Sequence, residues 1–493
     1  MAQVFGQYGR HRFWEMVPGL LSWGTIGLSL FAAFFAPIFA ITFIIVFDLY
    51  WTLRVLYFVI HVIAAYRELK KTRAVDWEAE VGKIAGADRL YHAIFLPTYQ
   101  ESLEILRDTL QHLKDAHFAK EKFLIVMGGE SGDEENFRRY QVVLEEEFKD
   151  VFGLLMFTVH PRGLPGEIPG KGSNLKWIAG KFREVIDTRK IPYADIIVSA
   201  FDVDTVPDPQ YFGRLAYLYS TVPDPMHSSY QPLTLFSNNI WYAAAPVRVA
   251  SFGTVFWLLG ELVRPERMWT FSSHSMPWQM LVDVGYHEGD IVSEDSRIFL
   301  QGLLRYDGHY RVTPMFLPVH MDAVSGSTLT ESLGALYKQQ RRWAWGVEHL
   351  PYMIEKFKEH PKMAWMTKFK YFFNHVEGMY TWSTAPFLIF ILGYLPFLFP
   401  TADPSALLAN SPFTLEWMMR IANVGVFATA TIAFFLLPRR PHRVSKWNWL
   451  VMIAQWALLP ITFTFFGAIP ALDAQTRFMF GKYLGFNVTK KAR

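Results

Sequence analysis

The stretch DIIVSAFDVDTVPD, residues 195–208, places two carboxylates one residue apart directly after an apolar run. The run from Asp195 to Phe201 has the composition of a buried parallel strand, and Asp202 and Asp204 follow it. A strand that delivers two acids to a crevice offers the hard oxygen ligands that Mg²⁺ and Mn²⁺ prefer. Paired acids at a strand end also form turns, so the motif alone is a weak signal. The stretch predicts an α/β sheet with a candidate divalent-metal site.

Around this stretch, residues 76–346 alternate short apolar runs with amphipathic ones. The alternation predicts a mostly parallel sheet with helices on both faces, in which ligands bind at the carboxyl ends of the strands. The expected strands are residues 92–96, 123–127, 154–159 and 196–201, and the expected helices are residues 102–117, 134–149, 173–186 and 209–220. Polar motifs follow three of these strands, at residues 97–101 (PTYQE), 128–133 (GGESGD) and 202–204 (DVD).

The composition is too apolar for an ordinary soluble enzyme, because 51% of the 493 residues are hydrophobic and 17% are aromatic. The excess lies at the two ends of the chain. A net charge of +3 gives no sign of a nucleic-acid partner. The absence of cysteine excludes disulfides, thiolate metal sites and thiol catalysis.

Residues 1–75 are predicted to form a transmembrane hairpin. Two apolar stretches, residues 17–35 and 37–65, approach or exceed the roughly 20 residues that a span requires. Basic residues precede the first stretch and follow the second, which places both flanks and the following domain in the cytoplasm. The first stretch lacks the processing site of a signal peptide, and a second span follows at once. We therefore expect an integral membrane protein.

Residues 371–493 are predicted to form a second transmembrane region with a basic cytoplasmic tail. The candidate spans are residues 378–399, 417–437 and 449–469. Three full crossings would put the tail outside, against the charge rule. Either the segment around Pro460 re-enters or it makes two short passes, and we expect the tail inside.

Two further segments are expected to lie beside the membrane without crossing it. Residues 347–370 predict an amphipathic connector on the membrane surface. Residues 240–262 are apolar, but Arg248 near their centre would cost about 2.5–3.5 kcal/mol on insertion. This stretch therefore predicts a buried or membrane-facing helix of the central domain.

Two loops at the expected ligand edge of the sheet carry candidate binding residues. Lys171 lies in a glycine-bearing loop before a helix, a setting that suits an anionic diphosphate, although a solvated lysine is equally compatible. Thr98, Tyr99 and Glu101 follow the first strand. Tyr99 could stack on a nucleotide base or be packed, and Glu101 could contact a nucleotide or complement a helix dipole.

Two later motifs suggest group-transfer chemistry. Ser293-Glu294-Asp295 opens an expected helix, where an acid serves either as a helix cap or as a general base for a hydroxyl. The segment QQRRWAWG, residues 339–346, gathers glutamine, arginine and tryptophan. Guanidinium groups pair with phosphate oxygens, and indole rings cover the apolar face of a sugar. The alternative is an aromatic-basic belt at the membrane interface, which Trp345 fits better than Trp343.

Taken in order, these motifs resemble those of the processive membrane-embedded family 2 glycosyltransferases, the group of cellulose, chitin and hyaluronan synthases. The resemblance covers residues 90–345 and rests on four motifs: residues 97–101, 202–204, 293–295 and Gln339-x-x-Arg342-Trp343. It implies a glycosyltransferase-A fold and an inverting transfer from a UDP- or GDP-linked sugar to a polysaccharide or lipid-linked acceptor. It also implies a multi-pass protein of the cell's inner or plasma membrane with a cytoplasmic catalytic domain, residues 76–346.

The resemblance assigns roles to matching residues. Asp202 and Asp204 would hold Mg²⁺ or Mn²⁺ with the diphosphate, and Asp295 would deprotonate the acceptor hydroxyl. The resemblance also assigns Gln339, Arg342 and Trp343 to the pyrophosphate and the acceptor's terminal sugar. Beyond these matches, we expect Thr98, Tyr99, Glu101, Glu130, Lys171 and Asp202 to bind the donor, and Glu294 and His274 to bind the acceptor or leaving group. His274 is at least as compatible with a core or helix-capping histidine. One departure is that Gly128-Gly129 stand where relatives carry two acids, so Glu130 or Asp133 would have to substitute.

Three functional hypotheses remain open from the sequence. The first is a processive synthase that extends a polysaccharide and passes it through its own helices. The second is a transferase that adds a single sugar to a polyprenyl phosphate or glycolipid. The third is a catalytically degenerate export or assembly subunit, which only Gly128-Gly129 supports.

Overall fold

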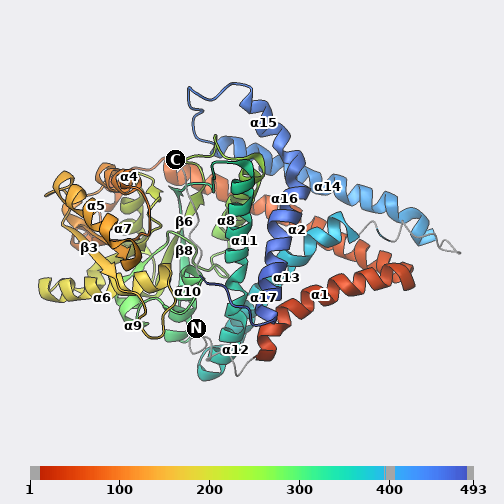
Figure 1. The fold of residues 1–493 in the computed structure, drawn as a ribbon, viewed down its shortest axis with the longest axis horizontal. Helices are drawn as coiled ribbons and strands as arrows, with labels where there is room; N and C mark the ends of the chain where they lie inside the picture. Colours follow the sequence, from red (N-terminus) through yellow and green to blue (C-terminus); the bar gives the residue numbers. More distant parts are fainter. Residues whose placement is uncertain (1–11, 393–394, 396–405, 486–493) are drawn as a thin grey trace.

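The computed structural model describes residues 12–392, 395 and 406–485. A sheet domain lies on one side, and long helices extend from it on the other (Figure 1). The predicted basic tail, residues 489–493, and the end of the predicted span 378–399 lie outside the described residues.

One sheet of eight strands organises the domain, in the order β3-β2-β1-β4-β7-β6-β8-β5. The first four in this order are parallel and match the predicted strands: β3 (Leu154–His160), β2 (Phe123–Glu130), β1 (Tyr91–Pro97) and β4 (Ile196–Ala200). Their register pairs Pro97 with Gly128 and Phe95 with Ala200. The polar motifs that follow these strands therefore meet at one edge of the sheet.

The second half of the sheet is mixed and was not predicted. It contains β7 (Ser275–Pro277), β6 (Ser228–Leu235), β8 (Arg311–His320) and β5 (Val206–Pro207). β7 runs antiparallel to β4 and to β6, whereas β6 and β8 are parallel. The Asp202–Asp204 segment thus connects β4, inside the parallel half, to β5 at the far edge.

Successive side chains of each strand point to opposite faces of the sheet and pack into two separate hydrophobic cores, one on each face. Ala93 and Phe95 of β1 belong to the core that includes α6, and Ile94 and Leu96 to the opposite core. The helices around the sheet are α3 (Trp77–Val81), α4 (Leu103–Asp115), α5 (Glu134–Glu147), α6 (Lys171–Arg189), α7 (Tyr211–Thr221), α8 (Ala245–Leu262), α9 (Trp278–Asp283), α10 (Glu294–Arg305) and α11 (Leu329–Ala344).

Long apolar helices flank the sheet domain. α1 (Arg12–Phe35) and α2 (Pro37–Arg73) form the predicted hairpin, broken at Ala36. α13 (Trp365–Phe390) and α14 (Ala406–Leu436) extend in the same general direction as α1 and α2 (Figure 1). Four described helices are long and apolar enough to cross a membrane: residues 12–35, 37–73, 409–436 and 448–479.

The last of these is a helical column that differs from the predicted span 449–469. It runs without reversal through α15 (Asn448–Ala454), η9 (Gln455–Leu458), α16 (Leu459–Phe463), the π-helical η10 (Thr464–Ala468) and α17 (Ile469–Met479). Gln455 near its start accepts a hydrogen bond from Arg248 of α8 (2.7 Å), and the Phe478 carbonyl at its end accepts one from Arg12 of α1 (2.9 Å). The column crosses the direction of α2 and α14 (Figure 1). The alternative of two short passes around Pro460 is therefore wrong.

The predicted connector, residues 347–370, is divided between three elements. η7 (Trp345–Glu348) and α12 (His349–Glu359) pack inward with several buried side chains, and residues from 365 onward begin α13. The predicted helix at 240–262 is confirmed as α8, shortened to Ala245–Leu262.

Candidate active site

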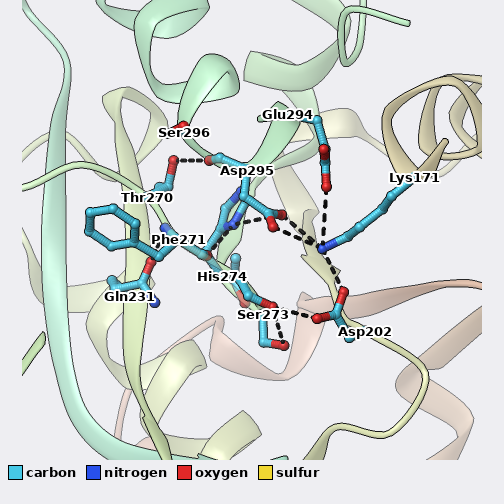
Figure 2. A network of polar contacts seen from close by, with 12 residues as sticks. Lys171, Asp202, Gln231, Thr270, Phe271, Ser273, His274, Glu294, Asp295 and Ser296 are labelled. Atoms are coloured by element: carbon cyan, nitrogen blue, oxygen red, sulfur yellow. Dashed lines mark hydrogen bonds and ion pairs between the residues drawn. The ribbon is translucent and has the colours of Figure 1, made fainter. Parts of the chain in front are cut away.

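A buried lysine joins the acids that the sequence singles out. The Lys171 Nζ lies 2.8 Å from Asp202 Oδ1, 2.9 Å from Asp295 Oδ1 and 3.9 Å from Glu294 Oε1. Figure 2 shows the three acids converging on this nitrogen from different elements. Lys171 starts α6, Asp202 follows β4, and Glu294 and Asp295 start α10. The end of β4 and the starts of α6 and α10 therefore bring together residues that are far apart in the sequence.

The electrostatics of this group are set by burial and by the acids. Burial by itself would lower the pKa of Lys171, but Asp202, Asp295 and Glu294 outweigh it and raise that pKa above its ordinary value. The lysine is therefore a fixed positive charge. Burial raises the pKa of Glu294, and the adjacent Asp295 carboxylate raises it further, while Lys171 and Arg342 act in the opposite direction.

Asp295 points into the site instead of capping its own helix. Both of its carboxylate oxygens accept hydrogen bonds from Lys171, at 2.9 and 3.1 Å. The Ser293 side chain makes no capping bond to α10 and donates instead to Glu348 (2.6 Å). Thr270 donates to the Asp295 carbonyl (2.6 Å), which ties the start of α10 to the segment after α8. The capping alternative considered for Asp295 is therefore not the role its side chain takes here.

The two acids of the Asp-x-Asp motif point in different directions. Asp202 is partly exposed to the cavity and accepts a hydrogen bond from Ser272 (2.8 Å). Asp204 is fully buried, and its Oδ2 accepts from the Asp322 amide (3.1 Å). Among the described residues, no three His, Cys, Asp or Glu side chains are gathered as a metal site. Because Mg²⁺ and Mn²⁺ need only one or two carboxylates beside a diphosphate, Asp202 fits such an ion. A role for Asp204 as a ligand stays a prediction.

Residues 98–101 form a tight loop beside these acids. Glu101 accepts hydrogen bonds from the Thr98 hydroxyl (2.7 Å) and from the Tyr99 amide. Ser102, and not Glu101, is the N-cap of α4. Thr98, Tyr99 and Glu101 all line the cavity, as their predicted contact with a nucleotide requires.

The Gly128-Gly129 pair at the end of β2 is explained by packing. A Cβ atom on Gly128 would overlap Asn174 and Ile178 of α6, and one on Gly129 would overlap Phe137 of α5. Glu130, the next residue, accepts hydrogen bonds from Asn174 (2.7 Å) and contacts His160 (3.0 Å). Of the two acids considered as substitutes, Glu130 lines the cavity, whereas Asp133 accepts from the Gln100 amide (3.2 Å) and from Asn136 (2.7 Å).

α11 brings the Gln-x-x-Arg-Trp residues to the same cavity as the acids. Gln339, Arg342 and Trp343 lie at i, i+3 and i+4 on one face of the helix, and all three line the cavity. The Trp343 ring packs near Phe236, with centroids 6.1 Å apart. Trp345 is buried, and its indole donates to Glu348 (3.1 Å). It is therefore not part of a membrane-interface belt.

His274 lies behind Asp295 and does not line the cavity. Its side chain is fully buried, its Nδ1 is 2.9 Å from the Phe271 carbonyl, and the same nitrogen is 4.0 Å from Asp295 Oδ1. Burial lowers the pKa of His274 to about 4, so the ring is neutral at physiological pH. This position agrees with the core alternative and makes His274 a support beneath the acid.

One cavity of about 1650 Å³ connects the acids with the long helices. At the sheet end its lining includes Lys171, Asp202 and Asp295, and at the far end it includes Val55 of α2, Ile389 of α13 and Val426 of α14. Trp343 lines the same cavity.

Sequence reasoning missed the residues that support the acids from behind. Glu348 is buried and accepts hydrogen bonds from Ser293 and from the Trp345 indole. Arg297 is also buried, and its guanidinium donates to Glu288 (2.6 Å). Ser272, which holds Asp202, was also missed. No local pattern marks these residues, although a buried acid such as Glu348 beside the Gln-x-x-Arg-Trp motif is unusual.

Solved structures similar to this chain are distant. The mannosyltransferase PcManGT from Pyrobaculum calidifontis, in complex with GDP-Man and Mn²⁺, is 15% identical, with a TM-score of 0.38 over 82% of this chain and 98% of that one. Residues 1–349 of TarS from S. aureus, in complex with UDP-GlcNAc, are 13% identical, with a TM-score of 0.38 over 81% of this chain and 94% of that one. No curated protein matches the sequence.

The family comparison is decisive. Residues 197–469 match the family described as Glycosyl transferase family group 2. The matched region runs from β4, just before Asp202, through Asp295 and the Gln-x-x-Arg-Trp motif to the helical column. Because it spans more than half of the sequence, this protein belongs to glycosyl transferase family group 2.

Proposed function

We propose that this protein transfers a sugar, with inversion, from a nucleotide-diphosphate sugar to the hydroxyl group of a membrane-held saccharide, and so lengthens a polysaccharide. The observation that carries the proposal is the single cavity that joins Asp202 and Asp295 to the long helices past Trp343. A soluble acceptor would not need a cavity that continues between α2, α13 and α14.

The donor side of the site is built for negative charge. Lys171 is a buried cation that Asp202 and Asp295 already pair with, so a diphosphate at this end of the cavity would need a further positive charge. A divalent cation held by Asp202 would supply Lewis-acid stabilisation of the departing nucleotide. Thr98, Tyr99 and Glu101 close the same end of the cavity and would hold the nucleoside.

The acceptor side is built to remove one proton. Asp295 would take the proton of the acceptor hydroxyl while that oxygen forms a bond to the anomeric carbon and the bond from that carbon to the diphosphate breaks. A single direct displacement inverts the configuration. Trp343 would cover the apolar face of the acceptor sugar, and Gln339 and Arg342 would bind its hydroxyl groups and the leaving diphosphate.

The proposed membrane topology has α1, α2, α13 and α14 as the crossings and a cytoplasmic sheet domain. The helical column, residues 448–479, then lies along the cytoplasmic face, because one end contacts α8 of the sheet domain and the other contacts Arg12 at the start of α1. Tyr483 donates to Glu15 of α1 (3.0 Å), which supports a cytoplasmic C-terminus.

A second candidate is the addition of a single sugar to a lipid. The apolar lining at the far end of the cavity, which includes Val55, Ile389 and Val426, favours it, because an acyl or polyprenyl chain would fit there.

The test is to incubate membranes containing the protein with radiolabelled UDP- and GDP-sugars and Mn²⁺, and to size both the aqueous and the organic-extractable products. A polymer of many sugars supports extension, whereas a label found only on an extractable lipid with one sugar contradicts it. The Asp295→Asn variant is expected to lose about 10²–10⁴-fold in rate, as the loss of a general base does, and to keep its affinity for the nucleotide sugar. The exposed Asp88→Asn serves as the matched control.

A further inference from the structure

Two arginines that no motif assigns line the same cavity just beyond the end of α8. Arg264 and Arg267 both contact Glu261, with Arg264 Nη2 2.6 Å from Oε1 and Arg267 Nε 3.2 Å from Oε2. All three residues line the cavity. The exposed Glu266 does not. Two guanidinium groups thus share one carboxylate at the cavity wall, which leaves an excess of positive charge there.

This charge is partly removed from water. Only 13% of the Arg264 side chain and 26% of the Arg267 side chain are exposed. Burial lowers the pKa of Arg264; the charge of Arg267 lowers it further, whereas Glu261 raises it. An anionic ligand would relieve both effects, because it would replace lost solvation and offset the repulsion between the two guanidinium groups.

The pair lies at the level expected for lipid headgroups. The Arg264 guanidinium carbon is 5.8 Å from the centroid of the Tyr57 ring on α2. Tyr57 follows Pro37, the first residue of α2, by twenty positions, and twenty helical residues rise about 30 Å, the thickness of the hydrocarbon core. α8 approaches α2 closely here, since a Cβ on Gly260 would overlap Phe58. Arg264 is therefore held against α2, near the cytoplasmic interface of the proposed topology, and Arg267 is joined to it through Glu261.

Arg267 is also close along the chain to the segment that contacts Asp295, the acid that would activate the acceptor. Arg267 precedes Thr270 by three residues, and the Thr270 hydroxyl bonds the Asp295 carbonyl at 2.6 Å. Three residues span at most about 11 Å when fully extended. A group bound at Arg267 can thus carry a short saccharide that reaches Asp295.

We propose that Arg264 and Arg267 bind the phosphate or diphosphate of a lipid-anchored saccharide, whose sugar then lies beside Asp295 as the acceptor on which synthesis begins. The inference rests on the proposed function and names the acceptor class. Guanidinium groups bind phosphate oxygens bidentately, and the neighbouring helix α2 would take the lipid chain.

The experiment measures binding of decyl phosphate to the full-length protein in maltoside micelles, by titration of its thermal unfolding midpoint. Decanol and inorganic pyrophosphate are the comparison probes. The double variant Arg264→Gln/Arg267→Gln is expected to bind decyl phosphate at least tenfold more weakly. The matched control removes two exposed arginines from the loop after α14, as Arg439→Gln/Arg443→Gln, and is expected to change the affinity less than twofold.

A folding defect is separated from loss of the site by a second variant, Arg264→Lys/Arg267→Lys, which keeps both charges beside Glu261 but loses the planar guanidinium forks. It is expected to fold normally and to bind decyl phosphate with intermediate affinity. Equal affinity of the glutamine variant and wild type overturns the proposal. Binding of pyrophosphate as tightly as decyl phosphate, or of decanol as tightly, overturns the lipid phosphate as the ligand. Asp295→Asn is expected to keep decyl phosphate binding while transfer is lost, so failure at the arginines and failure of the proposed function give different results.

Discussion

Lys171 Nζ donates to two acids from different elements: Asp202 after β4 and Asp295 at the start of α10. The lysine therefore neutralises part of the negative charge of these two acids, and a metal ion and a donor diphosphate would change these ion pairs on binding. Its side chain is 8% exposed, whereas those of Asp202 and Asp295 are 26% and 22% exposed. The acids, and not the lysine, remain accessible to a metal ion.

We expect Lys171→Met to lower the free energy of unfolding by about 1–3 kcal/mol, less than for a fully buried pair because both acids are partly hydrated. Mn²⁺ is expected to raise the unfolding midpoint of this variant more than that of wild type, because the acids freed from the lysine would bind the cation. Thermal unfolding with and without Mn²⁺ measures both effects. Lys176→Met, on the same helix but more exposed, is the control. Equal shifts by Mn²⁺ in Lys171→Met and wild type would contradict this account.

At this scale the sequence predicted the residues that end strands or begin helices, and missed those that act through tertiary contacts. Asp202 could be placed at the ligand edge because the carboxyl ends of parallel strands share one edge, and Lys171 because it lies in a glycine-bearing loop before a helix. Asp295 was assigned by the order of the motifs and not by the strand pattern. Glu348 could not, because its bond to Ser293 joins residues 55 positions apart and no periodicity marks it. The opposite directions of Asp202 and Asp204 depend on the Asp322 amide, which belongs to a segment with no predicted element.

Among the elements, β2 shows why a departure from the family pattern is compatible with an active enzyme. Its Gly128 lets α6 approach, and Asn174 of that helix in turn holds Glu130 at the cavity. The Gly128-Gly129 pair was the only support for a degenerate subunit, and it is accounted for by packing.

The substitution Gly128→Ala is expected to destabilise the protein by about 1–3 kcal/mol, the usual cost of overpacking. Because Asn174 must move, Glu130 moves with it, and the KM for the nucleotide sugar is expected to rise several-fold. Chemical denaturation and donor kinetics are the measurements. The control is Gly180→Ala on α6, the helix that carries Asn174. A Cβ at Gly180 meets nothing within 4 Å, so this substitution should be neutral or stabilising. An unchanged KM for Gly128→Ala would show that Glu130 does not contact the donor.

The short element η7 is expected to make stability depend on pH. Burial raises the pKa of Glu348 to about 7, although Arg297 and the hydrogen bonds from Ser293 and Trp345 oppose the shift. Between pH 4.5 and 7 the folded protein keeps a proton at Glu348 that the unfolded chain has lost. The free energy of unfolding therefore falls by about 3 kcal/mol as the pH rises through this range.

Glu348→Gln removes the titratable carboxyl group while keeping a hydrogen-bonding side chain of the same size. The unfolding midpoint of wild type relative to Glu348→Gln is therefore expected to fall between pH 5 and pH 8. Thermal unfolding of both proteins across this range measures the difference, in which the other titrating groups cancel. A constant difference across the range would mean that Glu348 is ionised throughout.

For the whole molecule, the glycosyltransferase-A class expected from the motif order is confirmed by the mostly parallel sheet together with the family match. Four parallel strands were predictable because each is a continuous apolar run bounded by turns. β6 and β8 were not, because β8 carries Pro314 and Pro318, which interrupt the strand pattern. The column 448–479 has the hydropathy of a span, and its contacts with α8 at one end and α1 at the other could not be predicted from that hydropathy.

If a growing saccharide passes between the membrane helices, narrowing that passage should shorten the product without stopping the chemistry. Val426 on α14 lines the cavity, and the next residue, Phe427, is 75% exposed on the outer face of the same helix. We expect Val426→Trp to shorten the polymer several-fold while the rate of the first transfer stays within about twofold of wild type, because Asp202, Lys171 and Asp295 lie at the other end of the cavity. Phe427→Trp, which places the same indole on the outer face of α14, should leave product length unchanged. Gel sizing of radiolabelled product from the three proteins tests the passage, and equal lengths for Val426→Trp and wild type would place the acceptor elsewhere.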